Sequence, residues 1–192
     1  MAAKGNGMVY VEAGSVHKLQ AVQRALKDAD KQLRKDLNAE LRQAVRPLLE
    51  DLKHSAEGIN FVSTAGKQPS RHARRNARTL KSGKVKLGRS LRKDMAFGLK
   101  TKISTGTQAG IRIKMDSRTP DVNNIARKIN ATGGVRHPLF GNRNDWYETR
   151  TTNGKGWFTD TADRQLPLVR KRIEAILDHW IAKTAAKIDR AA

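Results

Sequence analysis

The sequence predicts an α+β fold in which a small antiparallel sheet is packed by long N-terminal and C-terminal helices. Two observations lead to this prediction. Apolar residues recur at helical spacing near both ends of the 192-residue chain, and two short central segments alternate apolar with basic residues. A chain of this length fits one domain, which we expect over residues 15–192. We expect residues 1–14 to be a flexible arm, because they are rich in glycine and poor in apolar side chains.

The first helix is expected over residues 15–57. Its apolar residues step by three, four or seven, with charged residues between them. Pro47 lies inside this pattern and predicts a kink or a junction of two helices there. We favour a helix that packs on its own domain over a seam that pairs with a second copy. The apolar positions are Leu19, Val22, Leu26, Leu33, Leu37, Leu41, Val45, Leu48 and Leu52.

Residues 58–98 are expected to form an extended basic excursion, as a loop or a short helix, because Gly83 and Gly88 interrupt any longer helix. From residue 71 to residue 118 there are 15 Lys or Arg residues and two acidic residues. These cations could meet DNA phosphates or acidic protein surfaces, or form a solvated face without a partner. The candidate contacts with DNA or an acidic partner are Arg71, Arg74, Arg75, Arg78, Lys81, Lys84, Lys86, Arg89, Arg92 and Lys93.

Residues 99–158 are expected to hold the sheet and an aromatic loop region. Two half-buried antiparallel strands are predicted around Leu99–Ile103 and Ile111–Met115, with their Lys and Arg residues on one outer face. A short helix should open at Pro120 and end at Gly133.

The aromatic loop region is expected to contain a rigid loop from His137 to Asn142, because a proline and a Gly-Asn pair fall within it. A second hairpin is predicted with Asn153-Gly154 at its turn, between residues 145–151 and 155–158. Five of the nine aromatic residues lie between positions 140 and 158. We favour a core or protein-interface role for them over stacking on single-stranded bases.

The last helix is expected over residues 159–190. Its apolar face consists of Val169, Ile173, Ile176, Leu177, Trp180, Ile181 and Ile188. Pro167 should mark a bend, or the start of the regular part.

Composition and motifs exclude several classes of protein. Cysteine is absent, which excludes disulfides and thiolate metal sites, and no apolar run approaches a membrane span. The five histidines are scattered, and no nucleotide-binding or hydrolase motif occurs, so we expect no enzyme, no metal and no cofactor. A nuclease centre at His137 with Asp145 and Glu148 is a minor alternative. The net charge of +21 indicates an acidic partner, and we expect a soluble protein of a reducing compartment.

The stretch from Gly134 to Trp146 (GVRHPLFGNRNDW), followed by Gly156-Trp157-Phe158-Thr159-Asp160-Thr161-Ala162, resembles the neck and tail-completion proteins of long-tailed bacteriophages, especially those infecting actinobacteria. The resemblance covers about residues 85–185 and is most specific at 134–162. It implies a non-enzymatic virion protein that joins the DNA-filled head to the tail. It also implies synthesis in the host cytoplasm and a location in the virion neck.

The resemblance further implies a homo-oligomeric ring of six copies, or of twelve, around the channel through which DNA passes. The neighbours would be a connector or stopper protein and a tail terminator or tail tube protein, with no membrane. A stand-alone basic nucleic-acid-binding protein is the alternative. The candidate subunit-interface and loop residues are Arg136, His137, Pro138, Leu139, Phe140, Gly141, Trp146, Trp157 and Phe158.

Overall fold

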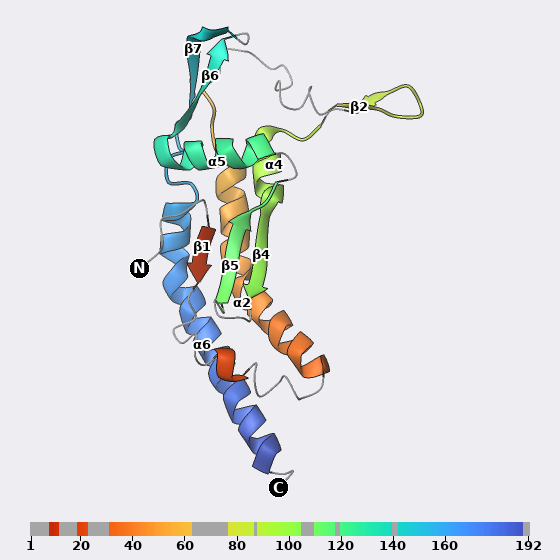
Figure 1. Cartoon of the computed structure of the whole chain (residues 1–192), viewed down its shortest axis with the longest axis vertical. Helices are drawn as coiled ribbons and strands as arrows, with labels where there is room; N and C mark the ends of the chain where they lie inside the picture. The colour runs from red at the N-terminus through yellow and green to blue at the C-terminus, as the bar shows by residue number, and fades with distance from the viewer. Residues whose placement is uncertain are drawn as a thin grey trace. The chain divides into compact units, whose positions relative to one another are not determined.

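A computed structural model of the chain confirms the α+β class, with helices and short strands along its length (Figure 1). It divides into two compact units rather than the single domain predicted over residues 15–192. Unit 1 consists of Met1–Glu50, Lys100–Lys114 and Ala162–Ala192, and unit 2 of Asp51–Leu99 and Met115–Thr161. The structure describes residues 8–11, 19–22, 31–62, 77–86, 88–104, 110–117, 120–139 and 142–189.

The sheet of unit 1 has the strand order β1-β5-β4. Strands β4 (Leu99–Ser104) and β5 (Gly110–Met115) confirm the two strands predicted from alternation. Strand β1 (Met8–Val11) pairs antiparallel with β5, with Val9 opposite Ile113. The prediction of a flexible arm is therefore wrong for residues 8–11, whose sequence MVYV is rich in strand-forming residues. The rest of the predicted arm lies outside the described residues.

Burial alternates along β4 and β5, as a half-buried sheet requires. Ile111 and Ile113 are fully buried, whereas Lys100 and Lys102 are exposed and Arg112 is half-buried. The basic residues of these strands therefore lie on the face that points away from the core, as predicted.

Helix α2 (Lys31–Glu57) continues through Pro47, and helix α6 (Thr159–Asp189) continues through Pro167. Both prolines therefore lie inside helices, and Pro167 does not mark the start of α6. Residues 19–22 are helical as well, while 15–18 and 23–30 lie outside the described residues. In both long helices most described residues of the predicted apolar stripe are buried, which favours packing within the chain over a seam for a second copy. Its buried members include Leu37, Leu41, Val45 and Leu48 in α2, and Val169, Ile173, Leu177 and Trp180 in α6. Leu33 and Ile176 are half-buried, and Ile181 is exposed.

Within unit 1 a polar contact joins the two long helices. The indole Nε1 of Trp180, a residue 1% exposed, donates a 2.8 Å hydrogen bond to Oε2 of Glu40. Because a buried N–H without an acceptor is costly, this bond fixes which side of α6 faces α2.

Unit 2 contains the helices α4 (Leu91–Gly98) and α5 (Pro120–Thr132) and two separate two-stranded sheets. Helix α5 has the predicted bounds, and it ends where Gly133 adopts a φ of +75°. The first sheet pairs β2 (Arg78–Thr79) with β3 (Val85–Lys86), and the second pairs β6 (Gly134–Leu139) with β7 (Asn142–Arg150).

The β6–β7 hairpin corrects two predictions for the aromatic loop region. Residues 137–139 belong to a strand rather than a loop, and Tyr147 pairs with His137 rather than with a residue of 155–158. Residues 155–158 form turns. Asn153 and Gly154 therefore do not connect two paired strands, and the Asn153 side chain instead binds a segment more than 90 residues earlier.

That segment, residues 58–62, follows α2. Four hydrogen bonds join it to residues 150–153 at the end of β7, and we call this set of bonds the clasp. Asn153 accepts from the backbone N–H of Asn60 at 2.8 Å and donates to the carbonyl of Gly58 at 2.8 Å. The backbone N–H of Val62 donates to the carbonyl of Arg150, and that of Thr152 donates to the carbonyl of Asn60. The clasp thus ties the C-terminal end of α2 to the base of the β6–β7 hairpin within unit 2.

Candidate interaction surfaces

The basic excursion contains a short antiparallel hairpin, which we call the basic hairpin (residues 78–86). Its register places Arg78 opposite Lys86 and Thr79 opposite Val85. Two further backbone hydrogen bonds close the turn, from Leu80 N to the Lys84 carbonyl at 2.8 Å and from Gly83 N to the Leu80 carbonyl at 2.9 Å. Gly83 has a φ of +76°, which is the left-handed residue that ends a three-residue hairpin loop. Part of the excursion, predicted as a loop or a short helix, is therefore a two-stranded hairpin.

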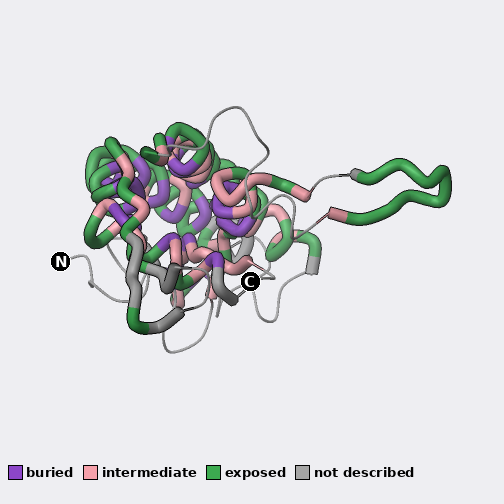
Figure 2. Tube along the Cα trace, turned by 90° about the horizontal axis from the view of Figure 1, so that it is seen from above, coloured by how far each residue is buried: buried purple, intermediate pink, exposed green. Residues whose placement is uncertain are grey.

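Every residue from 78 to 85 is exposed, as the green loop in Figure 2 shows. Arg78, Lys81 and Lys84 form no ion pair with any residue in the described ranges. Their charges therefore remain available to a ligand. Arg71, Arg74 and Arg75 lie outside the described residues, as does the side chain of Lys86.

The candidates at the start of α4 are used partly within unit 2. Arg92 donates from Nη1 to the carbonyls of Ile59 at 3.2 Å and Glu57 at 3.4 Å, so it binds backbone groups after and at the end of α2. The guanidinium of Arg89 lies over the ring of Phe97, 3.9 Å from its centroid. Both arginines thus have intramolecular roles, whereas the Lys93 side chain is exposed.

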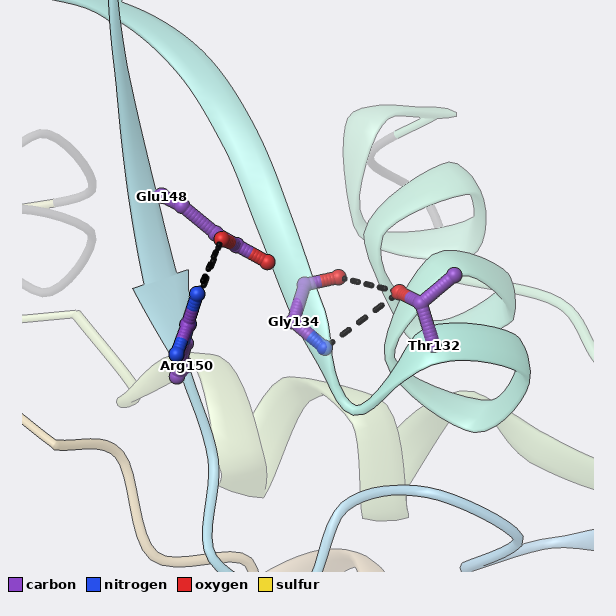
Figure 3. A network of polar contacts seen from close by, with 4 residues as sticks. All are labelled: Thr132, Gly134, Glu148 and Arg150. Carbon is purple, nitrogen blue, oxygen red and sulfur yellow. Dashed lines mark hydrogen bonds and ion pairs between the residues drawn. The ribbon is translucent and has the colours of Figure 1, made fainter.

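The second candidate surface is the β6–β7 hairpin, whose base is held by the end of α5. The hydroxyl of Thr132 lies within hydrogen-bond distance of the carbonyls of Lys128 (2.9 Å) and Gly134 (3.0 Å), and it accepts from the N–H of Gly134 (Figure 3). Thr151 donates from its backbone N–H and its hydroxyl to the carbonyl of Gly133. Thr132 of α5 therefore holds Gly134, the first residue of β6, and Thr151 holds Gly133, the residue before it.

Charged residues follow the exposed edge of this base. Arg150 donates from Nε and Nη2 to one carboxylate oxygen of Glu148, each at 3.2 Å (Figure 3). Arg136 lies opposite Glu148 in the register, an arrangement that places opposite charges on neighbouring strands. The exposed ion pair between Arg150 and Glu148 stabilises the fold only weakly. It does place charges of both signs on the β6–β7 hairpin.

Further along the ribbon, Pro138 lies in β6 opposite Trp146, and the register shifts between Pro138 and Leu139. Proline has no backbone donor, so strands tolerate it at edges and irregularities. Among the described residues no third strand pairs with β6. The side chains of His137, Pro138, Leu139 and Trp146, and all of Phe140 and Gly141, lie outside the described residues.

Trp157 and Phe158, predicted for a core or an interface, belong to the core of unit 2. They are 4% and 3% exposed, and their rings meet edge to face with centroids 5.5 Å apart. The Trp157 Nε1 donates to the carbonyl of Ala126 at 3.2 Å, and its own carbonyl accepts from the Ser55 hydroxyl. We therefore do not count these two side chains as interface surface.

Asn130, on α5, organises the turn that contains this aromatic pair, and the sequence analysis missed it. Its Oδ1 accepts from the backbone N–H groups of Phe158 at 2.9 Å and Thr159 at 3.3 Å, and its carbonyl accepts from Gly156 N. No local sequence signal marks this role, because the partners lie 28 and 29 residues away.

Within the described ranges, no group of three or more His, Asp or Glu residues could hold a metal ion. None of the helices in the described part is long and apolar enough to cross a membrane. The pKa of Arg46 is raised by its hydrogen bond to Glu50 and by the charge of that carboxylate, one turn away on α2.

Comparisons with protein-family models, with curated proteins and with solved structures give no match for this chain.

Proposed function

We propose that this chain is a structural protein of the head-to-tail interface of a long-tailed bacteriophage, acting in the neck or in tail completion. It would form a homo-oligomeric ring around the DNA channel and join the connector to the tail. The observation that carries the proposal is the anchored β6–β7 hairpin, which contains the stretch that resembles this family.

The construction of this hairpin suits an assembly contact. Its base is held by Thr132, Thr151 and the clasp, so the ribbon is fixed to the core of unit 2. Strand β6 has no second neighbour among the described strands, and an open strand edge can pair with another chain. In a closed ring each subunit offers two different faces, and β6 is our candidate for one of them.

The experiment is an absolute mass measurement by light scattering on a sizing column, after nuclease treatment, at low and high salt. We expect a nucleic-acid-free species of six copies of the 21.4 kDa chain, about 128 kDa. Phe140→Ala and Trp146→Ala should each reduce this species, because their strands and turn would form the contact. Thr152→Ala is the matched control and should leave the mass unchanged, because it removes only an exposed side chain and keeps the backbone N–H that Thr152 contributes to the clasp.

Two outcomes contradict the proposal. A wild-type monomer that binds added DNA at low salt would favour the nucleic-acid-binding alternative. Full-size rings from both alanine variants would show that the β6–β7 hairpin is not the contact.

A further inference from the structure

We infer that the basic hairpin (residues 78–86) contacts the phosphate backbone of duplex DNA. This inference goes beyond the proposed function, because it requires DNA at the hairpin whether or not the chain forms a ring.

The first argument is the uncompensated charge of the hairpin. Residues 78–86 contain four cationic residues and no acidic residue. Arg78 and Lys86 lie directly opposite each other in the register. Like charges at directly opposed positions destabilise a pair of strands, and this ladder has only two residue pairs to offset the repulsion. A phosphate placed beside both residues converts this repulsion into attraction, so the arrangement favours an anion-bound state.

The second argument concerns the chemical class of the anion. Three of the four cations are lysines: Lys81, Lys84 and Lys86. Lysine is depleted in protein–protein interfaces, whereas its compact ammonium charge serves phosphate binding well. The composition of the hairpin therefore favours nucleic acid phosphates over the acidic surface of a protein.

The third argument distinguishes duplex from single-stranded nucleic acid. Proteins that bind single strands stack the bases on aromatic side chains, and the basic hairpin contains no aromatic residue. A two-stranded ribbon, in contrast, fits the B-DNA major groove, which is about 12 Å wide. The apolar side chains of Leu80 and Val85, 38% and 66% exposed, can meet sugars and thymine methyl groups there.

The experiment measures binding of short fluorescent DNA duplexes of two unrelated sequences by anisotropy over a series of salt concentrations. The variant Arg78→Gln/Lys81→Gln/Lys84→Gln removes three described cations from the hairpin. For wild type, the logarithm of the affinity for DNA should fall linearly with the logarithm of salt concentration. The slope for the triple variant should be shallower by roughly 2 to 3, because each phosphate contact adds about 0.9 to its magnitude. Both duplexes should be affected alike, because backbone contacts carry no sequence information.

The matched control is Arg34→Gln/Lys35→Gln/Arg42→Gln, which removes the same charge from exposed positions of α2. This control should keep the wild-type slope. Equal losses of slope in both triple variants would overturn the inference, since net charge alone would then explain binding. Unchanged binding by the hairpin variant would also overturn it.

Two further measurements separate this role from others. Arg78→Thr should weaken DNA binding while leaving the melting temperature unchanged or higher, because it relieves the opposed pair of cations. A lower melting temperature would overturn the argument from charge repulsion. A competition experiment compares poly-glutamate with unlabelled duplex at equal total charge. If poly-glutamate displaces the labelled duplex equally well, the assignment to DNA is overturned in favour of an acidic protein partner. None of these outcomes alters the mass measurement that tests the ring.

Discussion

At the scale of single residues, the start of α6 depends on a side chain from another helix. The first N–H groups of a helix have no partner within it, and they are satisfied by capping groups or water. Here Asn130 of α5 supplies the acceptor for two backbone N–H groups, those of Phe158 and Thr159. Within unit 2, one amide oxygen thereby links α5 to the buried aromatic pair and to the first residue of α6.

Removal of this acceptor should destabilise the protein. Asn130→Ala leaves both N–H groups without it, and we expect a loss of about 1–2 kcal/mol in the free energy of unfolding. Asn130→Asp keeps the acceptor and places a negative charge near the N-terminus of α6, so it should stay within about 0.5 kcal/mol of wild type. Urea denaturation measures both. Equal stability of the two variants would mean that water replaces the amide oxygen at no cost.

The spacing of apolar residues in the sequence predicts most of the buried residues. It does not predict which polar side chains form hydrogen bonds to distant segments. Leu41, Leu48 and Ile173 are predicted by their spacing and are fully buried. Asn130 and Asn153 have no such local pattern, because their partners are set by tertiary structure. Gly154 is a further example, since a Cβ there would meet the side chain of Thr151 and approach Cγ2 of Ile129 to 2.5 Å. Its sequence context indicates only a turn.

At the scale of elements, α2 and α6 each contain an exposed proline that the helix accommodates. A proline inside a helix removes one backbone donor and crowds the carbonyl four residues earlier. Pro47 therefore lowers the stability of α2 relative to a residue that has a backbone N–H. The continuous helix shows that burial of the apolar stripe on either side outweighs this cost.

Pro47→Ala should raise the free energy of unfolding by about 1–3 kcal/mol, because it restores an N–H that can bond to the carbonyl of Gln43. Gln43→Ala, at an exposed position of the same helix, changes only helix propensity and should shift stability by a few tenths of a kcal/mol. Thermal and urea denaturation report both variants. A destabilised Pro47→Ala variant would show that the packing of α2 requires the local geometry that proline imposes.

Elements with strong periodicity were predictable, and elements formed by pairing alone were not. Strands β4 and β5 alternate apolar and basic residues, and their bounds agree with the prediction. Residues 137–142 contain Pro, Gly and Asn, which are disfavoured in strands, so their sequence indicates a loop. Residues 145–151 were predicted as a hairpin strand, but β7 pairs with β6 rather than with residues 155–158. Their pairing is instead held at the base by Thr132, Thr151 and the clasp, which only the tertiary structure shows.

At the scale of the whole molecule, the dominant physical property is the net charge of +21. Like charges distributed over a compact chain repel one another and lower its stability. Several cations have intramolecular partners, including Arg92 and Arg150, but Arg78, Lys81 and Lys84 of the basic hairpin form no ion pair with any described residue.

Salt should therefore stabilise this protein. The Debye length falls from about 30 Å at 0.01 M to about 8 Å at 0.15 M, so added salt screens the repulsion. We expect the melting temperature to rise over this range by about 2–4 °C for each kcal/mol of repulsion relieved. Lys35→Glu/Lys171→Glu lowers the net charge to +17, and its melting temperature should depend less on salt. A melting temperature that falls with salt would show that ion pairs outweigh repulsion.

The division of the chain into two discontinuous units has a consequence for the order of events during synthesis. Glu40 and its partner Trp180 are 140 residues apart, and the clasp joins residues separated by 88 to 95 positions. A nascent chain leaves the ribosome from its N-terminus, so unit 2 can close before α6 has been translated in full. The hydrogen bond between Glu40 of α2 and Trp180 of α6 can form only after most of the chain has been translated. Contacts of such long sequence separation also slow folding, so we expect the assembly of unit 1 to be the later and slower step.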